Sequence, residues 1–472
     1  MMLQLKSFGY NCIRCSHNPY SDSFARIADR VGMLVVDELT DKWSDNDYWG
    51  GRQPFTHIWH KLITEWIKRD RNRPSIILWS LGNELQIREG WAGFEGTNDW
   101  GITTYNIFNQ LVKRWDNTRL TTVAMFPARA GAITRHDKEF NDYLVPPELA
   151  CATEVASFNY QSDKYDAYLK YKPDLILFQS EAETSNLLQP YYNMDRKRTV
   201  GMAYWGSAEY WGESNKWPKK GWNYSFFDHT MRPYPQAYLI KSAFMPEIPE
   251  VHIGVVDAAG AESVSWNDVI VGRMALNECW NHTPGSRQSL FTFTNAHSVE
   301  LLVNGQSMGV QENDTTQANL RNMIYWKDVP YGNGGSVVAI ARDKSGKEVA
   351  RHHIETAGKA VALRIEAETP ADWKADGMDL QYINVTAIDK KGRPVWDYNK
   401  PLTLQMEGAA WLVALDNGDH YTDELFHGIT SKRMYQGRMQ IILRSTKTPS
   451  NVKLEISSAD LKEKLSLKTS LK

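Results

Sequence analysis

The sequence predicts a multidomain protein in which a (β/α) barrel precedes two all-β sandwich domains. The chain has 472 residues, enough for about three domains at roughly 150 residues each. Up to about residue 247, short apolar runs alternate with longer helical patterns, which is typical of βα units around a parallel sheet. Beyond that point strand-like alternation and turn signals take over. We therefore expect a barrel over 1–247 and immunoglobulin-like sandwiches over 248–360 and 361–472.

The predicted barrel strands are short apolar runs that end in polar or aromatic residues. In chain order they are 11–16, 33–38, 75–81, 120–125, 155–160, 174–181 and 200–206. Helical patterns lie between them, for example at 21–32, 57–71 and 102–116, and in the second of these Ile58, Leu62, Trp66 and Ile67 fit one helical face. Seven such strands nearly make an eight-stranded barrel. The first eleven residues lack the long apolar stretch typical of a signal peptide, and we expect them to be part of a helix leading into a strand.

The predicted sandwiches are built from shorter strands with frequent turns. Alternating runs at 289–305 and 336–358 are bounded by glycine-containing turns, and a second unit follows with runs at 361–369, 382–395 and 451–458. Each unit spans a little over a hundred residues, which is the size of an immunoglobulin-like sandwich.

Composition limits the partners that the chain is expected to bind. The formal net charge of −2 gives no sign of a polyanion partner such as nucleic acid, and no apolar run approaches the roughly 18 residues that span a bilayer. The 18 Trp and 22 Tyr suit carbohydrate, whose apolar faces stack on aromatic rings, although large cores use such residues too. Oligomeric state and cellular location stay open, with a bacterial periplasmic or extracellular location plausible if a signal peptide lies upstream.

Four cysteines do not make a disulfide framework. Cys12 and Cys15 form a CxxC pair inside a predicted strand, where residues three apart point to opposite faces. With no second such pair, the sequence predicts no zinc site there.

Two glutamates follow predicted barrel strands in the same way. Glu84 comes after the run IILWSLGN, and Glu181 comes after LILFQS. Barrel enzymes place catalytic groups where strands end, and cleavage of a glycosidic bond needs two carboxyl groups and no cofactor. One protonates the leaving oxygen, and the other attacks the anomeric carbon or activates water. Either glutamate alone is more readily explained as a solvated loop residue; as a pair, with their flanking residues, they favour catalysis.

Those flanks resemble glycoside hydrolase family 2, the family of β-galactosidases, β-glucuronidases and β-mannosidases. The segment NCIRCSHNPYSDSFARIADRVGMLVVDE (11–38) and the segment RDRNRPSIILWSLGNE (69–84) carry the resemblance in order. It covers essentially the whole chain, because the later units look like the extra C-terminal sandwich domains of some bacterial members. The resemblance implies a retaining enzyme with Glu84 as acid/base and Glu181 as nucleophile.

The resemblance also implies supporting roles for other residues. Asn83 would bind the sugar 2-hydroxyl, while Arg14 and Tyr160 would keep the nucleophile oriented and ionised, since a nearby guanidinium lowers the pKa of a carboxyl group. Glu84 must stay protonated until it donates. Further positions that match sugar-pocket or supporting residues are His17, Asn18, Glu38 and Trp205. Each of these supporting residues could instead serve a purely structural purpose.

Glu183 could compete with Glu181 for the role of nucleophile. Glu181 directly follows Gln-Ser at the predicted strand end, as in the family, whereas Glu183 is expected in the loop beyond. A retaining mechanism predicts carboxyl groups of Glu84 and Glu181 about 5–5.5 Å apart, against roughly 6.5–9.5 Å for an inverting pair.

Three departures from the family pattern shape the expected function. Family members usually carry two domains and a first barrel strand before the point at which this chain opens, so we expect a fragment or a barrel completed by something else. The stretch 221–235 lacks the Lys with which family glucuronidases grip the sugar carboxylate, which favours a neutral sugar such as a β-galactoside. The magnesium ligands of some members have no counterpart after Glu38, so no metal is expected to be required. The alternatives are a β-glucuronidase, a β-mannosidase, or a non-catalytic carbohydrate-binding remnant.

Overall fold

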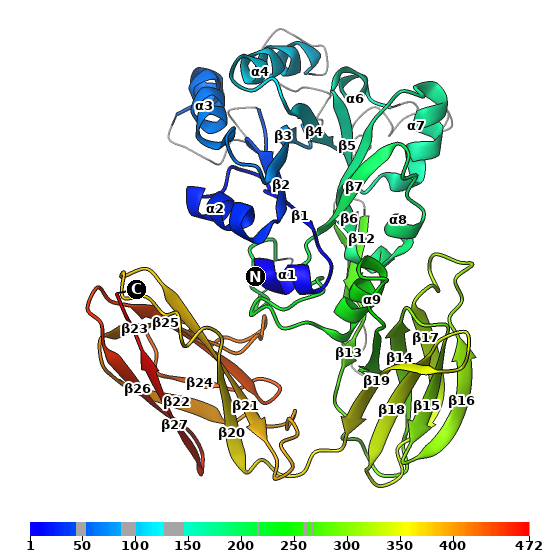
Figure 1. Cartoon of the computed structure of the whole chain (residues 1–472), viewed down its shortest axis with the longest axis vertical. Helices are drawn as coiled ribbons and strands as arrows, with labels where there is room; N and C mark the ends of the chain where they lie inside the picture. Colours follow the sequence, from blue (N-terminus) through cyan, green and yellow to red (C-terminus); the bar gives the residue numbers. More distant parts are fainter. Residues whose placement is uncertain are drawn as a thin grey trace.

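The computed structural model describes residues 1–43, 53–85, 101–126, 146–214, 217–257, 262–266 and 269–471. Its first part is a seven-stranded parallel sheet whose strands neighbour one another in chain order and curl into a nearly closed barrel (Figure 1). The strands are β1 (Cys12–Arg14), β2 (Leu34–Glu38), β3 (Ile76–Asn83), β4 (Leu120–Met125), β5 (Val155–Asn159), β6 (Leu177–Glu183) and β7 (Thr199–Trp205). The predicted fold class is confirmed.

Helices cover the outside of the barrel (Figure 1). They are α1 (Met2–Ser7), α2 (Asp22–Val31), α3 (Phe55–Asp70), α4 (Ile102–Trp115), α6 (Glu148–Ala152), α7 (Tyr165–Tyr171), α8 (Gln189–Tyr192) and α9 (Pro235–Phe244), with short 3-10 turns at Ser162–Lys164 and Thr184–Asn186. The sequence sets the ends of α2: the Ser21 side chain accepts a hydrogen bond from the Phe24 amide, and Gly32 ends the helix with a left-handed φ of 68°.

The buried face of α3 differs slightly from the predicted one. Trp66 and Ile67 are buried as expected, but the face is centred on Ile63, and Ile58 and Leu62 are only half-buried at its margin. A helix packed against a curved sheet buries the turn nearest the sheet most deeply. The spacing of apolar residues in the sequence does not determine which turn that is.

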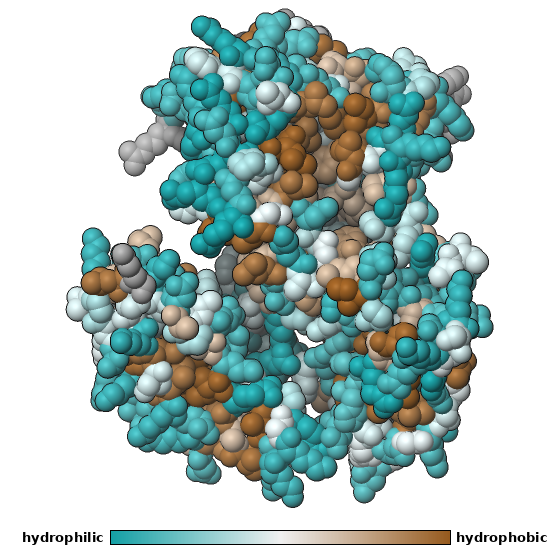
Figure 2. Space-filling model, viewed as in Figure 1, coloured by the Kyte–Doolittle hydropathy of each residue, from teal (hydrophilic) through white to brown (hydrophobic). Residues whose placement is uncertain are grey.

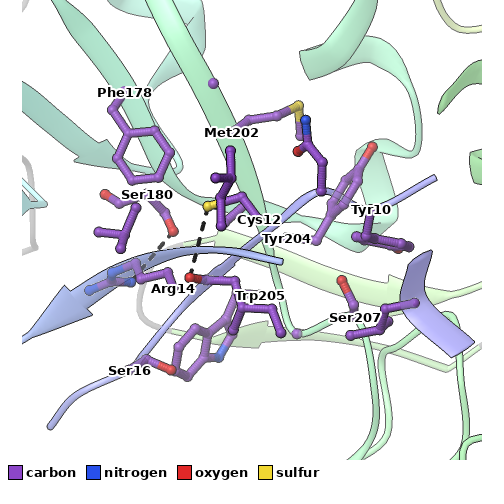
Figure 3. Close-up of a pocket in the computed structure, with 18 of the residues that line it drawn as sticks. Tyr10, Cys12, Arg14, Ser16, Phe178, Ser180, Met202, Tyr204, Trp205 and Ser207 are labelled. Atoms are coloured by element: carbon purple, nitrogen blue, oxygen red, sulfur yellow. Dashed lines mark hydrogen bonds between the residues drawn. The ribbon is translucent and has the colours of Figure 1, made fainter. Parts of the chain in front are cut away.

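The two end strands of the described sheet, β1 and β7, are not hydrogen-bonded to each other. A cavity of about 750 Å³ lies beside them, and Figure 3 shows Cys12 and Arg14 of β1 facing Met202, Tyr204 and Trp205 of β7 across it. Apolar side chains are also exposed at or beside the amino-terminal ends of several strands, namely Leu34, Ile77, Leu120, Ile176 and Val200. Figure 2 shows hydrophobic side chains gathered around a hollow in the barrel part.

After β7 the chain forms a long connection before the sandwiches begin. It carries a small hairpin of β8 (Tyr210–Trp211) and β9 (Gly221–Trp222), and it ends at α9. This connection lies next to the carboxyl end of β7, so it can shape the rim of the barrel.

Two pairs of four-stranded antiparallel sheets follow. The first pair has the orders β13-β10-β14-β17 and β16-β15-β18-β19, and the second pair has β20-β21-β25-β23 and β24-β22-β26-β27. The strands of these sheets are β10 (Val251–Val256), β13 (Leu276–Asn277), β14 (Arg287–Thr294), β15 (Ser298–Val303), β16 (Gln306–Glu312), β17 (Met323–Pro330), β18 (Ser336–Arg342), β19 (Glu348–Glu355), β20 (Ala362–Ala367), β21 (Leu380–Ile388), β22 (Pro401–Glu407), β23 (Ala410–Asp416), β24 (Ser431–Arg433), β25 (Arg438–Ser445), β26 (Asn451–Ser458) and β27 (Leu461–Lys468). Between β10 and β13, β11 (Glu262–Trp266) and β12 (Val269–Arg273) form a separate two-stranded antiparallel sheet. The predicted boundaries near residues 248 and 360 stay a proposal.

Among the described residues, the hydrophobic core of the barrel extends into the first sandwich but not into the second. Leu276 and Phe293 of the first sandwich belong to the same buried cluster as the barrel, next to Leu239 and Ile240 of α9. The second sandwich has a core of its own, whose buried residues all lie between Leu363 and Leu467. The barrel and the first sandwich therefore share apolar packing.

No helix in the described ranges has the length and apolar character needed to cross a membrane.

Candidate active site

Glu181 lies within β6 near its carboxyl end, and two side chains from other strands hold its carboxylate. Arg14, at the end of β1, donates from Nη1 to Oε1 at 2.7 Å, and the Tyr160 hydroxyl donates to Oε2 at 2.5 Å. The Glu181 side chain is only 5% exposed. Both carboxylate oxygens are therefore fixed in orientation by groups that the sequence had singled out.

Arg14 is in turn held by Glu38, which ends β2. The guanidinium donates from Nε and Nη2 to the two oxygens of Glu38 at 2.9 and 3.0 Å, a bidentate arrangement that fixes its plane. Glu38 is fully buried and also accepts from Ser80 at 2.7 Å. Glu38 thus fixes the orientation of Arg14.

Asn83 is the last residue of β3, Glu84 follows it, and both lie beside Asn159, the last residue of β5. The Asn159 amide donates to Asn83 Oδ1 at 3.0 Å and to Glu84 Oε1 at 3.1 Å. Arg14 also donates to Asn83 Oδ1 at 3.0 Å. One chain of hydrogen bonds therefore runs from Glu84 through Asn159, Asn83 and Arg14 to Glu181.

The electrostatics of Glu181 differ from the simple expectation of a lowered pKa. Burial raises the pKa of Glu181 above its ordinary value, and the Arg14 guanidinium opposes this rise. The charge of Glu84 raises the pKa of Glu181 as well, because the two carboxyl groups share one small site. Desolvation of an almost fully buried carboxylate outweighs the single guanidinium beside it.

The backbone is strained at two of these strand ends. Glu84 has a φ of 45° and Tyr160 a φ of 59°, in the left-handed region that residues with a Cβ seldom adopt. Such strain persists only where the surrounding structure enforces it, and it concentrates at functional sites. Both strained residues direct their side chains into the same network.

His17 and Trp205 lie at the edge of this network. The His17 ring stacks on the Trp205 ring with centroids 5.1 Å apart and planes 9° apart, and His17 Nδ1 lies 2.7 Å from Glu38 Oε1. Burial lowers the pKa of His17, but the contact with Glu38 outweighs it, so the net shift is upward. Trp205, the last residue of β7, is half-buried and also lines the cavity between β1 and β7 (Figure 3).

Asn18 lies apart from the other predicted site residues. It is exposed, and its amide donates to the backbone carbonyl of Pro19 at 3.1 Å. Within the described part of the chain, its hydrogen bonding does not join the network around Glu181, so a role in sugar binding stays a prediction.

Glu183 is the last residue of β6, which corrects the expectation that it lies in the loop beyond. β6 extends two residues past the predicted end because Glu183 still pairs with Trp205 of β7. Its carboxylate accepts a hydrogen bond from Asn186 at 3.2 Å, and burial raises its pKa. Arg14 and Tyr160 contact Glu181 instead.

Besides Ser80, three residues of the described network had not been singled out from the sequence. Asn159 bridges Asn83 and Glu84, Asp41 accepts from the Asn83 amide at 3.0 Å, and Ser180 donates to Asn159 at 2.7 Å. Asn159 and Ser180 could have been found, because both are polar residues at a barrel strand end. Asp41 lies in the loop after β2, where nothing in the sequence pattern marks it.

Side chains that could together bind a metal ion lie outside the network around Glu84 and Glu181. Among the described residues, two clusters have ligand atoms close enough to share an ion: Glu209 with His229 and His420, and His252 with Glu278 and His352. Neither includes Glu84 or Glu181.

Family profiles match the chain along most of its length. The profile described as "Glycosyl hydrolases family 2, TIM barrel domain" matches residues 2–200, and "Glycoside hydrolase family 2 C-terminal domain 5" matches residues 363–465. The chain belongs to glycoside hydrolase family 2. A domain of unknown function matches the family 2 chain between these two regions, at residues 285–350.

Relatives of this family 2 chain include Beta-galactosidase BoGH2A of Bacteroides ovatus, which is 25% identical over 97% of the chain and 57% of its own length. A putative beta-glucuronidase of Formosa agariphila is 49% identical over 83 residues, or 17% of the chain and 8% of its own length. A crystal structure of a family 2 member from Bacteroides cellulosilyticus superposes with a TM-score of 0.81 at 26% identity, covering 99% of this chain and 57% of that one. The chain thus spans little more than half the length of the Bacteroides ovatus and Bacteroides cellulosilyticus proteins.

Proposed function

We propose that this chain carries the catalytic residues of a retaining β-glycosidase that acts on terminal β-galactosides. The observation that supports this most directly is that both carboxylate oxygens of Glu181 accept hydrogen bonds, one from Arg14 and one from Tyr160. A second buried glutamate, Glu84, belongs to the same hydrogen-bond network. A carboxylate fixed in this way is suited to attack one carbon atom along one direction.

In the proposed reaction, Glu84 gives its proton to the leaving glycosidic oxygen while a Glu181 oxygen bonds to the anomeric carbon. The bond between that carbon and the leaving oxygen breaks, which leaves a glycosyl ester on Glu181 and an ionised Glu84. Glu84 then takes a proton from water, the resulting hydroxide attacks the anomeric carbon, and Glu181 leaves as a carboxylate. Asn83 lies between the two glutamates, where its amide could bind the sugar 2-hydroxyl.

The choice of a neutral sugar rests on the connection after β7. Residues 221–235 lack the Lys that would pair with a sugar carboxylate, and the relative aligned over nearly the whole chain is named a β-galactosidase. A β-glucuronidase is the second candidate, because two shorter matches carry that name.

Turnover of aryl β-galactoside, β-glucuronide and β-mannoside tests the assignment directly. We expect hydrolysis of the β-galactoside with the β-anomer as first product by NMR, loss of turnover in Glu84→Gln, and labelling of Glu181 by a 2-fluoro galactoside. A β-glucuronide preference would change the substrate, and labelling of Glu183 would overturn the nucleophile. Sugar binding without any turnover would favour a carbohydrate-binding protein.

A further inference from the structure

A buried cluster outside the candidate active site joins the barrel to the second sandwich. Glu209 and His229 lie in the connection between β7 and α9, and His420 follows β23 of the second sandwich. Glu209 and His420 are 5% and 4% exposed, and the His229 side chain is equally buried. The cluster is therefore a polar group enclosed between two parts of the fold.

Three atoms of these side chains converge. Glu209 Oε2 lies 3.0 Å from His420 Nε2 and 3.5 Å from His229 Nδ1. Ligands of a tetrahedral zinc ion, at zinc–nitrogen and zinc–oxygen distances near 2.0 Å, are about 3.3 Å apart. The observed separations lie on either side of that value.

None of the converging atoms has a well-aligned hydrogen-bond partner within the described part of the chain. Glu209 Oε2, His229 Nδ1 and both ring nitrogens of His420 are buried without one, although Oε2 lies within ion-pair distance of both rings. Buried polar atoms are nearly always satisfied, so a group of unsatisfied atoms pointing into one place indicates an absent partner. An ion would satisfy Oε2, Nδ1 and Nε2 together.

The remaining atoms of two of these side chains are occupied in the way that metal ligands require. His229 Nε2 lies 2.8 Å from Asp416 Oδ1, so donation to that carboxylate leaves Nδ1 as a lone-pair atom. Tyr234 donates to Glu209 Oε1 at 2.8 Å, and Arg273 lies 3.3 Å from the same oxygen. Carboxylate-bound histidines and hydrogen-bonded carboxylates are the usual outer partners of a zinc site.

We propose that Glu209, His229 and His420 bind a divalent zinc ion, with a water in the fourth position. Two imidazoles and one carboxylate at these separations suit zinc better than magnesium or calcium, which prefer six or more oxygen ligands. The ion would cross-link the second sandwich to the segment between β7 and α9, which includes Tyr210. Because the Tyr210 ring packs edge-on against Trp205 at 5.9 Å, the cross-link would also steady the rim of the candidate active site.

The other candidate cluster is less suited to an ion. His352 Nδ1 accepts from the Ile253 amide at 3.0 Å, and His252 is stacked between the rings of Tyr238 and His352 with Nε2 2.8 Å from Glu278. Its atoms are therefore largely satisfied without a metal, which makes His352 a useful control.

The test measures metal on the purified protein. After incubation with zinc and removal of the excess, elemental analysis should give about one zinc per chain. His420→Ala and Glu209→Gln should abolish that zinc, whereas His427→Ala, an exposed histidine a few residues further along, and His352→Ala should retain it. Cobalt in place of zinc should give the strong visible bands of a tetrahedral site in the unaltered protein, a readout that needs no variant.

Two results would overturn the proposal. Unaltered protein that holds neither zinc nor cobalt would mean that the three side chains form a metal-free ionic cluster. Zinc retained in a folded His420→Ala protein would place the ion elsewhere. Neither result depends on glycosidase activity, so this test and the test of the proposed function fail separately.

Discussion

At the scale of single residues, the Tyr160 hydroxyl is the sharpest probe of the candidate site. Tyr160→Phe removes the hydrogen bond to Glu181 Oε2 and leaves the ring in place. A hydrogen bond to a charged group contributes about 1.5–3 kcal/mol, so turnover should fall about 10- to 100-fold. Steady-state kinetics on the aryl glycoside measures it, with Tyr171→Phe, at an exposed tyrosine, as the matched control. Equal activity in both variants would remove Tyr160 from the mechanism.

Arg14 should control the pH dependence of activity. In the proposed mechanism Glu181 must be ionised to attack, and burial raises its pKa while Arg14 opposes the rise. In Arg14→Gln the opposing charge is gone, so the pKa of Glu181 rises further and the acidic limb of the profile of kcat/KM moves to higher pH. Arg14→Lys keeps the charge but loses the bidentate contact with Glu38, so activity should fall with a smaller displacement of the limb. An unmoved limb in Arg14→Gln would contradict this role.

At the scale of elements, the carboxyl end of β3 depends on a close approach that only glycine allows. A Cβ on Gly82 would lie 2.7 Å from Nε1 of Trp43, whose indole donates to the Leu81 carbonyl at 2.8 Å. Gly82→Ala must therefore displace the indole or the strand end that carries Asn83 and Glu84.

We expect Gly82→Ala to lower kcat/KM by about 100-fold, since a misplacement near 1 Å is enough for that loss. Gly201→Ala in β7 is the control, because its Cβ would meet only a Phe178 ring atom at 3.9 Å. Circular dichroism on both variants separates a local shift from unfolding. Full activity in Gly82→Ala would show that the strand end tolerates the added atom.

At the scale of the whole molecule, the arrangement of cores predicts which parts fold alone. The second sandwich has its own buried cluster, and polar contacts such as that of Arg232 with Gln436 join it to the barrel. Residues 361–471 expressed alone should therefore give a cooperative melting transition. The barrel without the first sandwich should not, because Leu276 and Phe293 complete its core. A disordered second sandwich by NMR would contradict this expectation.

Much of this architecture could be predicted from the sequence, because barrel strands are buried and end in polar residues. Looking for polar residues at the ends of predicted barrel strands led to Glu84 and Glu181 as candidates, and the same search could have found Asn159. It could not find Asp41, which reaches Asn83 from a loop, or the contact of His420 with Glu209 across two parts of the fold. Such contacts depend on how distant segments pack, which local periodicity does not encode.

The ion pair of Arg14 with Glu181 has a consequence beyond the chemistry of one carbon atom. It ties β1 to β6, past β7, where the described ring has no ladder of backbone hydrogen bonds. Charged groups at active sites commonly lower the stability of a protein, whereas this buried ion pair connects two strands across the opening of the ring. In the proposed double displacement, the glycosyl ester neutralises Glu181 and removes its ion pair with Arg14, and hydrolysis of the ester restores that ion pair. The ring would then loosen and tighten once in every turnover.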